Sequence, residues 1–145
     1  MTEVAFHFGA PDKLGYACRL LRKAVGSGAK VLVVADEVDL QQLDADLWAM
    51  SSTDFVPHCS NTADIFVQQK CPVVLASQID SVLDQKQVLV NLAQTVVEGF
   101  EKFMRVIEVV STDDRDRDLA RLRWKHYTAL GYTITRHDLT LQGTN

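Results

Sequence analysis

The strongest constraint on the fold is a run of apolar, mostly β-branched residues with no polar interruption. Lys30–Val34 reads K-V-L-V-V, so apolar side chains point to both faces of the predicted strand. Such a strand must be covered on both faces, as strands are in a parallel sheet. Three further runs predict strands at Pro72–Ala76, Val88–Leu92 and Arg105–Val110. The chain is therefore expected to build a buried sheet.

Helical patterns alternate with these strands. A short aromatic strand, Val4–Phe8, precedes a helix that Asp12 can cap and that Gly26–Gly28 would end. A second helix follows Asp36 and carries Trp48 in its last turn. The apolar residues at helical spacing are Leu14, Cys18, Leu21 and Val25 in the first helix and Leu40, Leu43 and Leu47 in the second. This order predicts a βαβ unit at the start of the chain.

The remaining segments are less regular. Phe55–His58 contains Pro57, which lacks the N–H that a central strand needs, so it is expected to be an edge segment or an extended turn. A short helix is possible within residues 96–103, and Tyr132–Thr135 alternates like a last strand. We expect one α/β domain over residues 1–145, with a central, mostly parallel or mixed sheet flanked by helices.

Composition narrows the class of protein. The chain has 145 residues, 47% of them hydrophobic, and a formal net charge of −4, which suits one domain with a real core. The acidic balance disfavours broad nucleic-acid binding. No apolar run reaches membrane-spanning length, and Met1–Gly9 lacks signal-peptide character, so we expect a cytoplasmic protein without membrane contact.

The sequence offers little raw material for catalysis or metal binding. Cys18, Cys59 and Cys71 contain no C-x-x-C pair, which predicts reduced structural thiols rather than a disulfide framework or a zinc module. His58 adjoins Cys59, but neighbours in an extended segment point to opposite faces. Gly26–Gly28 follows a helix and therefore resembles a C-cap, not a phosphate loop. We expect no catalytic residue, metal or cofactor.

Two other polar groups have structural explanations. Asp36, Glu37 and Asp39 lie in the first turn of a predicted helix, where carboxylates are favoured. His7 and His137 lie in the first strand and near the last, and we expect them to be packed or hydrogen-bonded.

The last helix, introduced by Ser111–Asp114 and ended by Gly131, carries an unusual stripe. Helical spacing gathers five residues on one face, namely Arg117, Arg121, Trp124, Lys125 and Thr128. On the opposite side, expected to dock on the core, are Leu119, Leu122, His126 and Leu130. An outward Trp124 among cations would suit a partner that is both apolar and anionic. Alternatively, the stripe is a solvated face on which Trp124 pads the stems of Arg121 and Lys125.

Two motifs together carry a family resemblance. Leu43–Trp48 (L-D-A-D-L-W), then Phe55–His58 (F-V-P-H), and the later Leu119–Lys125 helix segment resemble the chi subunit of bacterial DNA polymerase III, and the resemblance covers essentially the whole chain. It implies a Rossmann-like fold without nucleotide chemistry. It further implies a non-catalytic connector in the clamp-loader assembly, with two protein partners.

The resemblance also implies sites for those partners. The C-terminal tail of single-stranded DNA-binding protein, acidic and ending in a phenylalanine carboxylate, would bind at Arg117, Arg121, Trp124, Lys125, Thr128 and Gly131. The psi subunit would bind at Trp48, Phe55, Val56, Pro57 and His58, of which some are expected to be interface and the rest core. DNA would be contacted only indirectly.

Two other functions stay open from the residues. One is a small α/β nucleotide-binding protein or enzyme that uses the carboxyl edge of the sheet. The other is direct DNA binding by the last helix, because tryptophan stacks on bases and arginine pairs with phosphates.

Overall fold

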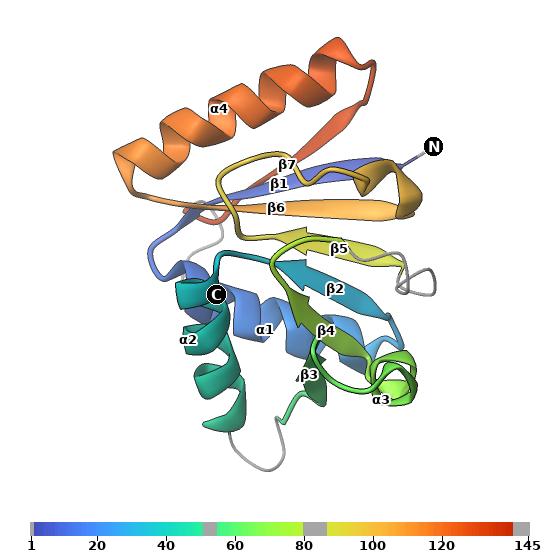
Figure 1. Ribbon diagram of the computed structural model, residues 1–145. Helices are drawn as coiled ribbons and strands as arrows, with labels where there is room; N and C mark the ends of the chain where they lie inside the picture. Colours follow the sequence, from blue (N-terminus) through green and yellow to red (C-terminus); the bar gives the residue numbers. More distant parts are fainter. Residues whose placement is uncertain (1, 51–54, 80–86, 141–145) are drawn as a thin grey trace.

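Seven parallel strands form one sheet in the computed structural model, which describes residues 2–50, 55–79 and 87–140 (Figure 1). The strand order is β3-β4-β2-β5-β6-β1-β7, and every neighbouring pair runs parallel. The strands are β1 (Glu3–Ala10), β2 (Val31–Val34), β3 (His58–Ser60), β4 (Val73–Ala76), β5 (Val88–Asn91), β6 (Arg105–Ser111) and β7 (Ile134–Asp138). The predicted α/β class is confirmed.

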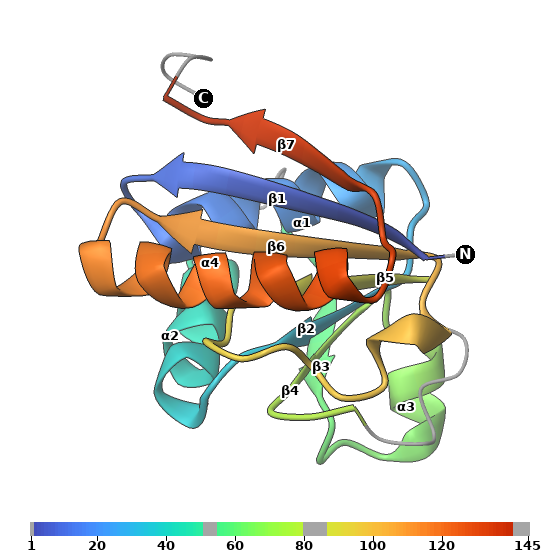
Figure 2. The same ribbon diagram turned by 90° about the horizontal axis from the view of Figure 1, so that it is seen from above.

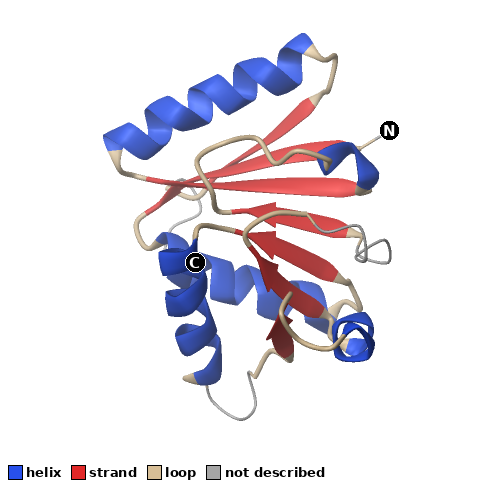
Figure 3. Ribbon diagram, viewed as in Figure 1, coloured by secondary structure: helices blue, strands red, loops and turns tan. Residues whose placement is uncertain are grey.

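Helices cover both faces of the sheet (Figure 3). They are α1 (Lys13–Gly26), α2 (Glu37–Trp48), α3 (Ile65–Lys70), α4 (Asp114–Ala129) and the 3₁₀ turn η2 (Phe100–Lys102). Figure 2 shows α4 on one face, along β6 and β1, with α1 behind the sheet. The strand residues divide accordingly, because Leu32 and Val34 pack on the α4 side while Val31 and Val33 pack against α1 and α2. The fully buried V-L-V-V run is thus explained by a core on each face.

Several expected boundaries are confirmed by side-chain caps. The carboxylates of Asp12, Asp36 and Asp113 accept backbone N–H bonds at the starts of α1, α2 and α4. Trp48 is the last residue of α2, and β3 is an edge strand that begins at His58, directly after Pro57. Helix α3 was not predicted, and the possible helix within 96–103 is reduced to η2.

The last strand begins later than the sequence pattern predicts. Gly131 has φ +89°, and its N–H bonds to the Thr128 carbonyl oxygen, while the Tyr132 N–H bonds to that of Tyr127. These two bonds form the C-terminal cap of α4, in which Gly131 adopts the left-handed backbone conformation, and they keep Tyr132 in the turn. The strand therefore covers Ile134–Asp138 instead of Tyr132–Thr135.

The prediction of which α4 face docks on the core is wrong. Leu122 and Leu130 are 61% and 54% exposed, and His126 is exposed as well. The buried residues of α4 are Asp116, Ala120, Arg123 and Tyr127. A buried arginine and a buried aspartate made this face look polar in the sequence, and their partners lie on other elements.

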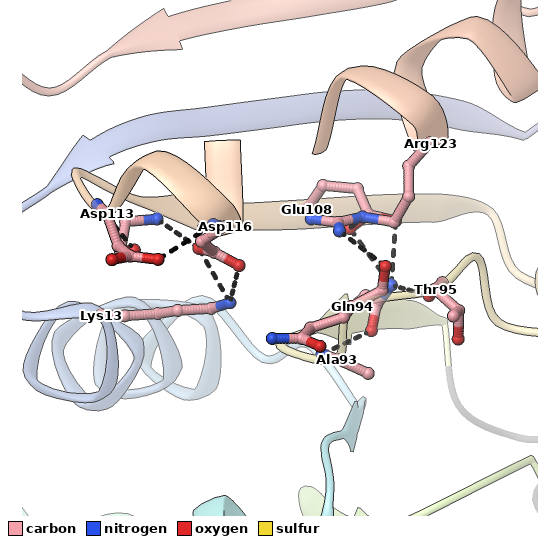
Figure 4. A network of polar contacts seen from close by, with 10 residues as sticks. Lys13, Ala93, Gln94, Thr95, Glu108, Asp113, Asp116 and Arg123 are labelled. Atoms are coloured by element: carbon pink, nitrogen blue, oxygen red, sulfur yellow. Dashed lines mark hydrogen bonds and ion pairs between the residues drawn. The ribbon is translucent and has the colours of Figure 1, made fainter. Parts of the chain in front are cut away.

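A buried polar network binds the middle of α4 to the sheet (Figure 4). The Arg123 Nε donates to Glu108 Oε1 of β6 at 2.9 Å, and the Tyr127 hydroxyl donates to Glu108 Oε2 at 2.7 Å. The Asn91 amide of β5 also donates to both carboxylate oxygens. Burial raises the pKa of Glu108, although the charge of Arg123 opposes this effect. The ion pair and its hydrogen bonds explain how Arg123 is accommodated at 2% exposure.

A second contact fixes the start of α4. The Lys13 ammonium of α1 lies 3.2 Å from Asp116 Oδ1 (Figure 4). The Ser111 backbone N–H donates to Asp116 Oδ2 at 2.8 Å. Burial opposes ionisation of Asp116, but these donors outweigh it, and its pKa lies below the usual value. Together the two contacts set the rotation of α4 about its axis.

Candidate functional site

In the observed orientation of α4 about its axis, a groove lies between this helix and the strands β1 and β7. Four residues of the predicted stripe border the buried face of α4 and line the junction of helix and sheet, namely Arg117, Arg121, Trp124 and Lys125. The cavity volume is about 500 Å³. We call this the α4 groove, which is lined by Phe6, Phe8, Val110, Arg117, Ala120, Arg121, Trp124, Lys125 and Arg136.

The floor of the α4 groove is apolar and largely aromatic. Phe6 and Phe8 are two residues apart on β1, so both point to the α4 side of the sheet. The Trp124 ring packs with its centroid 5.0 Å from that of Phe6, and Trp124 is half-buried against the core. It does not point outward as expected, because it packs against the core and lines the groove.

Cationic side chains form the rim of the groove. Arg117 and Arg121 are exposed and each forms an ion pair one turn back along α4, with Asp114 and Asp118 respectively. Exposed pairs of this kind contribute little to stability, so a stronger anionic ligand can displace them. Lys125 also lines the groove, and no described residue forms an ion pair with it. The groove thus offers an apolar floor beneath positive charge.

Arg136 is a groove residue that sequence reasoning missed. It lies opposite Phe6 in the β1–β7 register, and its guanidinium carbon is 5.4 Å from the Phe8 ring centroid and 5.9 Å from that of Trp124. The pattern that ended the last strand at Thr135 excluded it. The alternation of Ile134 and Arg136 toward the α4 side would have identified it if the strand had been placed correctly.

Two of the six expected groove residues do not line the cavity. The Thr128 hydroxyl donates to the Trp124 carbonyl oxygen at 2.9 Å and is exposed. Gly131 serves as the cap residue described above, because its positive φ is strained for other residues. The structure brings Arg117, Arg121, Trp124 and Lys125 together, and adds Arg136.

The second predicted surface divides into exposed and buried residues. Trp48 is 62% exposed and Phe55 39% exposed, and their ring centroids lie 5.1 Å apart. Pro57 is exposed, whereas Val56 and His58 are buried. We call Trp48, Phe55 and Pro57 the Trp48 patch.

His58 supports the Trp48 patch from below. Its Nε2 lies 2.9 Å from Asp44 Oδ1 of α2, its Nδ1 lies 2.7 Å from the Val56 carbonyl oxygen, and its ring centroid is 5.2 Å from that of Trp48. Both ring nitrogens are therefore engaged, and the ring holds the end of α2 against β3. Cys59 packs toward the opposite face, as expected for neighbours in a strand.

Neither a metal-binding cluster nor a membrane-spanning helix is found in the part of the chain that the structure describes. Within residues 2–50, 55–79 and 87–140, no three histidine, cysteine or acidic side chains are placed to hold a metal ion. None of the described helices is long and apolar enough to cross a membrane.

The two strand histidines pack against each other. The His7 Nδ1 lies 2.5 Å from the Tyr16 hydroxyl oxygen, and the His7 ring centroid lies 4.4 Å from that of His137.

The carboxyl edge of the sheet carries a different cavity, of about 650 Å³. Its lining includes Glu98, Glu101 and Lys102, so the carboxylates outnumber the single cation. A phosphate group would meet net negative charge there, which disfavours the nucleotide-binding alternative. The Gly26–Gly28 segment ends α1, as expected, and contributes no phosphate loop.

Comparison with known proteins places the chain in a family. The family model described as "DNA polymerase III chi subunit, HolC" matches residues 1–135. The chain belongs to the DNA polymerase III chi subunit family.

Three curated chi subunits are similar to the chain over most of their length. The protein from Pseudomonas aeruginosa is 31% identical over 144 residues, covering 96% of this chain and 98% of the relative. The Escherichia coli protein is 29% identical over 118 residues (81% and 79%), and the Haemophilus influenzae protein is 27% identical over 124 residues (85% and 85%). The chi family match includes the α4 side of the groove and ends one residue before Arg136.

Proposed function

We propose that this chi-family chain is a non-catalytic adaptor in DNA replication. It links the C-terminal tail of single-stranded DNA-binding protein to the clamp loader of the DNA polymerase III holoenzyme through the psi subunit. The observation that carries the proposal is the α4 groove, where an aromatic floor lies beneath several cations. A peptide that ends in an aromatic residue with a free carboxylate, preceded by aspartates, matches both properties.

The proposed binding mode assigns a role to each wall of the groove. The terminal phenyl ring packs against Trp124 and Phe6, where it exchanges water for aromatic contacts. The tail's aspartates pair with Arg117, Arg121 and Lys125 on the rim. Because these cations are exposed, the association is fast, modest in affinity and weakened by salt.

The Trp48 patch is the proposed site for the psi subunit. Trp48, Phe55 and Pro57 expose aromatic and apolar surface that the domain's own core leaves uncovered. Aromatic anchors of this kind are typical of stable interfaces. Val56 and His58 are buried and support the patch from the core, so the proposed contacts with psi are made by the three exposed residues.

Titration of a tail peptide tests the proposal. A peptide ending in Asp-Phe-carboxylate should bind the wild-type chain, and Arg121→Ala and Trp124→Ala should each weaken binding by about tenfold or more, as expected for a lost charge-assisted bond or a hot-spot aromatic residue. Amidation of the peptide's C-terminus should weaken binding similarly. Isothermal titration calorimetry at low salt provides the dissociation constants.

Arg115→Ala is the matched control, because Arg115 is exposed on α4 and does not line the groove. Its affinity should match that of the wild type. Equal binding of the amidated and free peptides would show that the groove does not recognise the terminal carboxylate, which would contradict the proposed match to a free C-terminus. A clear rise in melting temperature with ATP or NAD would instead support the nucleotide-binding alternative, since a ligand of the folded state must stabilise it.

A further inference from the structure

We infer that Arg136 of β7 is the residue that recognises the terminal carboxylate of the tail, and so makes the groove specific for a free C-terminus. The inference rests on the proposed function and deepens it. It assigns the carboxylate to the strand side of the groove and the tail's acidic side chains to the helix side.

The groove cations differ in the charge that each already faces. Arg117 and Arg121 are paired with Asp114 and Asp118 of their own helix, so a ligand anion must compete with these carboxylates. Arg136 forms no ion pair with any described residue, and its guanidinium lies beside aromatic rings. An arginine without a carboxylate partner offers more charge to an incoming anion than a paired one.

The covalent geometry of the ligand fixes where its carboxylate can lie. A terminal aromatic residue carries its ring and its carboxylate on one Cα, so the carboxylate must lie beside the aromatic floor. Arg136 contacts that floor directly, because its guanidinium is near both Phe8 and Trp124. Arg117 and Arg121 extend from α4 at the rim, where preceding residues of the tail would lie.

The shape of the guanidinium group suits a carboxylate. Stacked on a ring, a guanidinium keeps its edge N–H groups free, and these can bind both oxygens of a carboxylate. A lysine at the same position would provide a point charge without the planar fork. Lys125, the other groove cation without a described ion pair, has that limitation.

A thermodynamic cycle between residue and ligand tests the inference. Free and amidated forms of the tail peptide are titrated into wild-type chain, Arg136→Gln, Arg136→Lys and Arg121→Gln, with Arg115→Gln as the exposed control outside the groove. Circular dichroism melting confirms that each variant is folded. Arg136 is exposed at an edge strand, so its substitution should leave the melting temperature nearly unchanged.

The preference for the free carboxylate should fall only in the two Arg136 variants. Arg136→Gln should lower the affinity for the free peptide about tenfold, so that it approaches the affinity for the amidated peptide. Arg136→Lys should have an intermediate effect. Arg121→Gln should lower the affinity for both peptides and keep the ratio between the two affinities.

Two outcomes would overturn the inference and are distinguishable from each other. If Arg136→Gln keeps the wild-type ratio of free to amidated peptide, or loses both peptides equally, then Arg136 does not read the carboxylate, although the groove still binds the tail. If the wild-type chain binds neither peptide, the proposed function itself fails.

Discussion

Trp124 serves both the fold and the proposed site. Its indole packs with Phe6 against the core, and the residue also lines the groove, where the Arg136 guanidinium carbon lies 5.9 Å from the indole centroid. Replacing it therefore removes core contacts as well as ligand contacts. For this reason binding measurements on Trp124→Ala need the stability of the variant beside them, whereas those on Arg121 do not.

His7 is the residue whose titration should influence stability. Burial, and then the nearby charges of His137, Arg105 and Lys23, lower its pKa from 6.5 to about 4. Between these two pH values the unfolded chain carries a proton on His7 that the folded chain does not. Acidification through this window therefore lowers the free energy of unfolding, by at most about 3 kcal/mol from this residue.

The substitution His7→Gln removes that titration. The variant should show a smaller loss of unfolding free energy than the wild type between pH 6.5 and 4, measured by urea unfolding at several pH values. His126→Gln, on the exposed face of α4, should keep the wild-type pH dependence. Parallel pH profiles for wild type and His7→Gln would contradict the account of His7.

At the scale of the element, α4 shows what the sequence could and could not predict. Its start, its end and the cationic stripe followed from local rules, because Asp113, Gly131 and the helical period act within a few residues. The docking face did not, because it depends on Glu108, fifteen residues earlier, which neutralises Arg123. Hydrophobic periodicity is misleading where a buried ion pair replaces apolar contact.

Breaking the Arg123–Glu108 pair should destabilise the chain strongly. Arg123→Met leaves the Glu108 carboxylate buried without its cation, which should lower the free energy of unfolding by about 3–5 kcal/mol. The double variant Arg123→Met with Glu108→Gln should recover part of this loss, because the uncompensated charge is gone. Chemical denaturation measures both values.

A loss below about 1 kcal/mol in Arg123→Met would show that the pair does not fix α4. The exposed pair of Arg121 and Asp118 on the same helix is the control, and Arg121→Met should change stability by no more than about 1 kcal/mol.

At the scale of the whole molecule, the α/β class and parallel sheet followed from the alternation of apolar runs and helices. The strand order did not follow from the sequence, because it depends on where each crossover places the next strand in the sheet. That order has a functional consequence, since β7 and β3 are the two edges of the sheet. The α4 groove lies at the β7 edge and the Trp48 patch at the β3 edge, so they are at opposite ends of the molecule (Figure 1).

The candidate sites were predictable to different degrees for the same reason. Four groove residues share one helix face, so helical spacing alone grouped them. Arg136 comes from β7, and only the β1–β7 pairing brings it to Phe8 and Trp124. For the Trp48 patch, the sequence motif at Leu43–His58 indicated the region. Only the structure shows that Trp48 is exposed and Val56 is buried.

The proposed adaptor holds two partners at once, so a binding measurement with all three proteins is its sharpest test. Sedimentation velocity of the full chain with the psi subunit and single-stranded DNA-binding protein of the same bacterium should show one complex containing all three. Trp48→Ala should release only the psi subunit, and Arg121→Ala only the single-stranded DNA-binding protein. Mutual displacement of the two partners, or loss of both from either variant, would contradict the account.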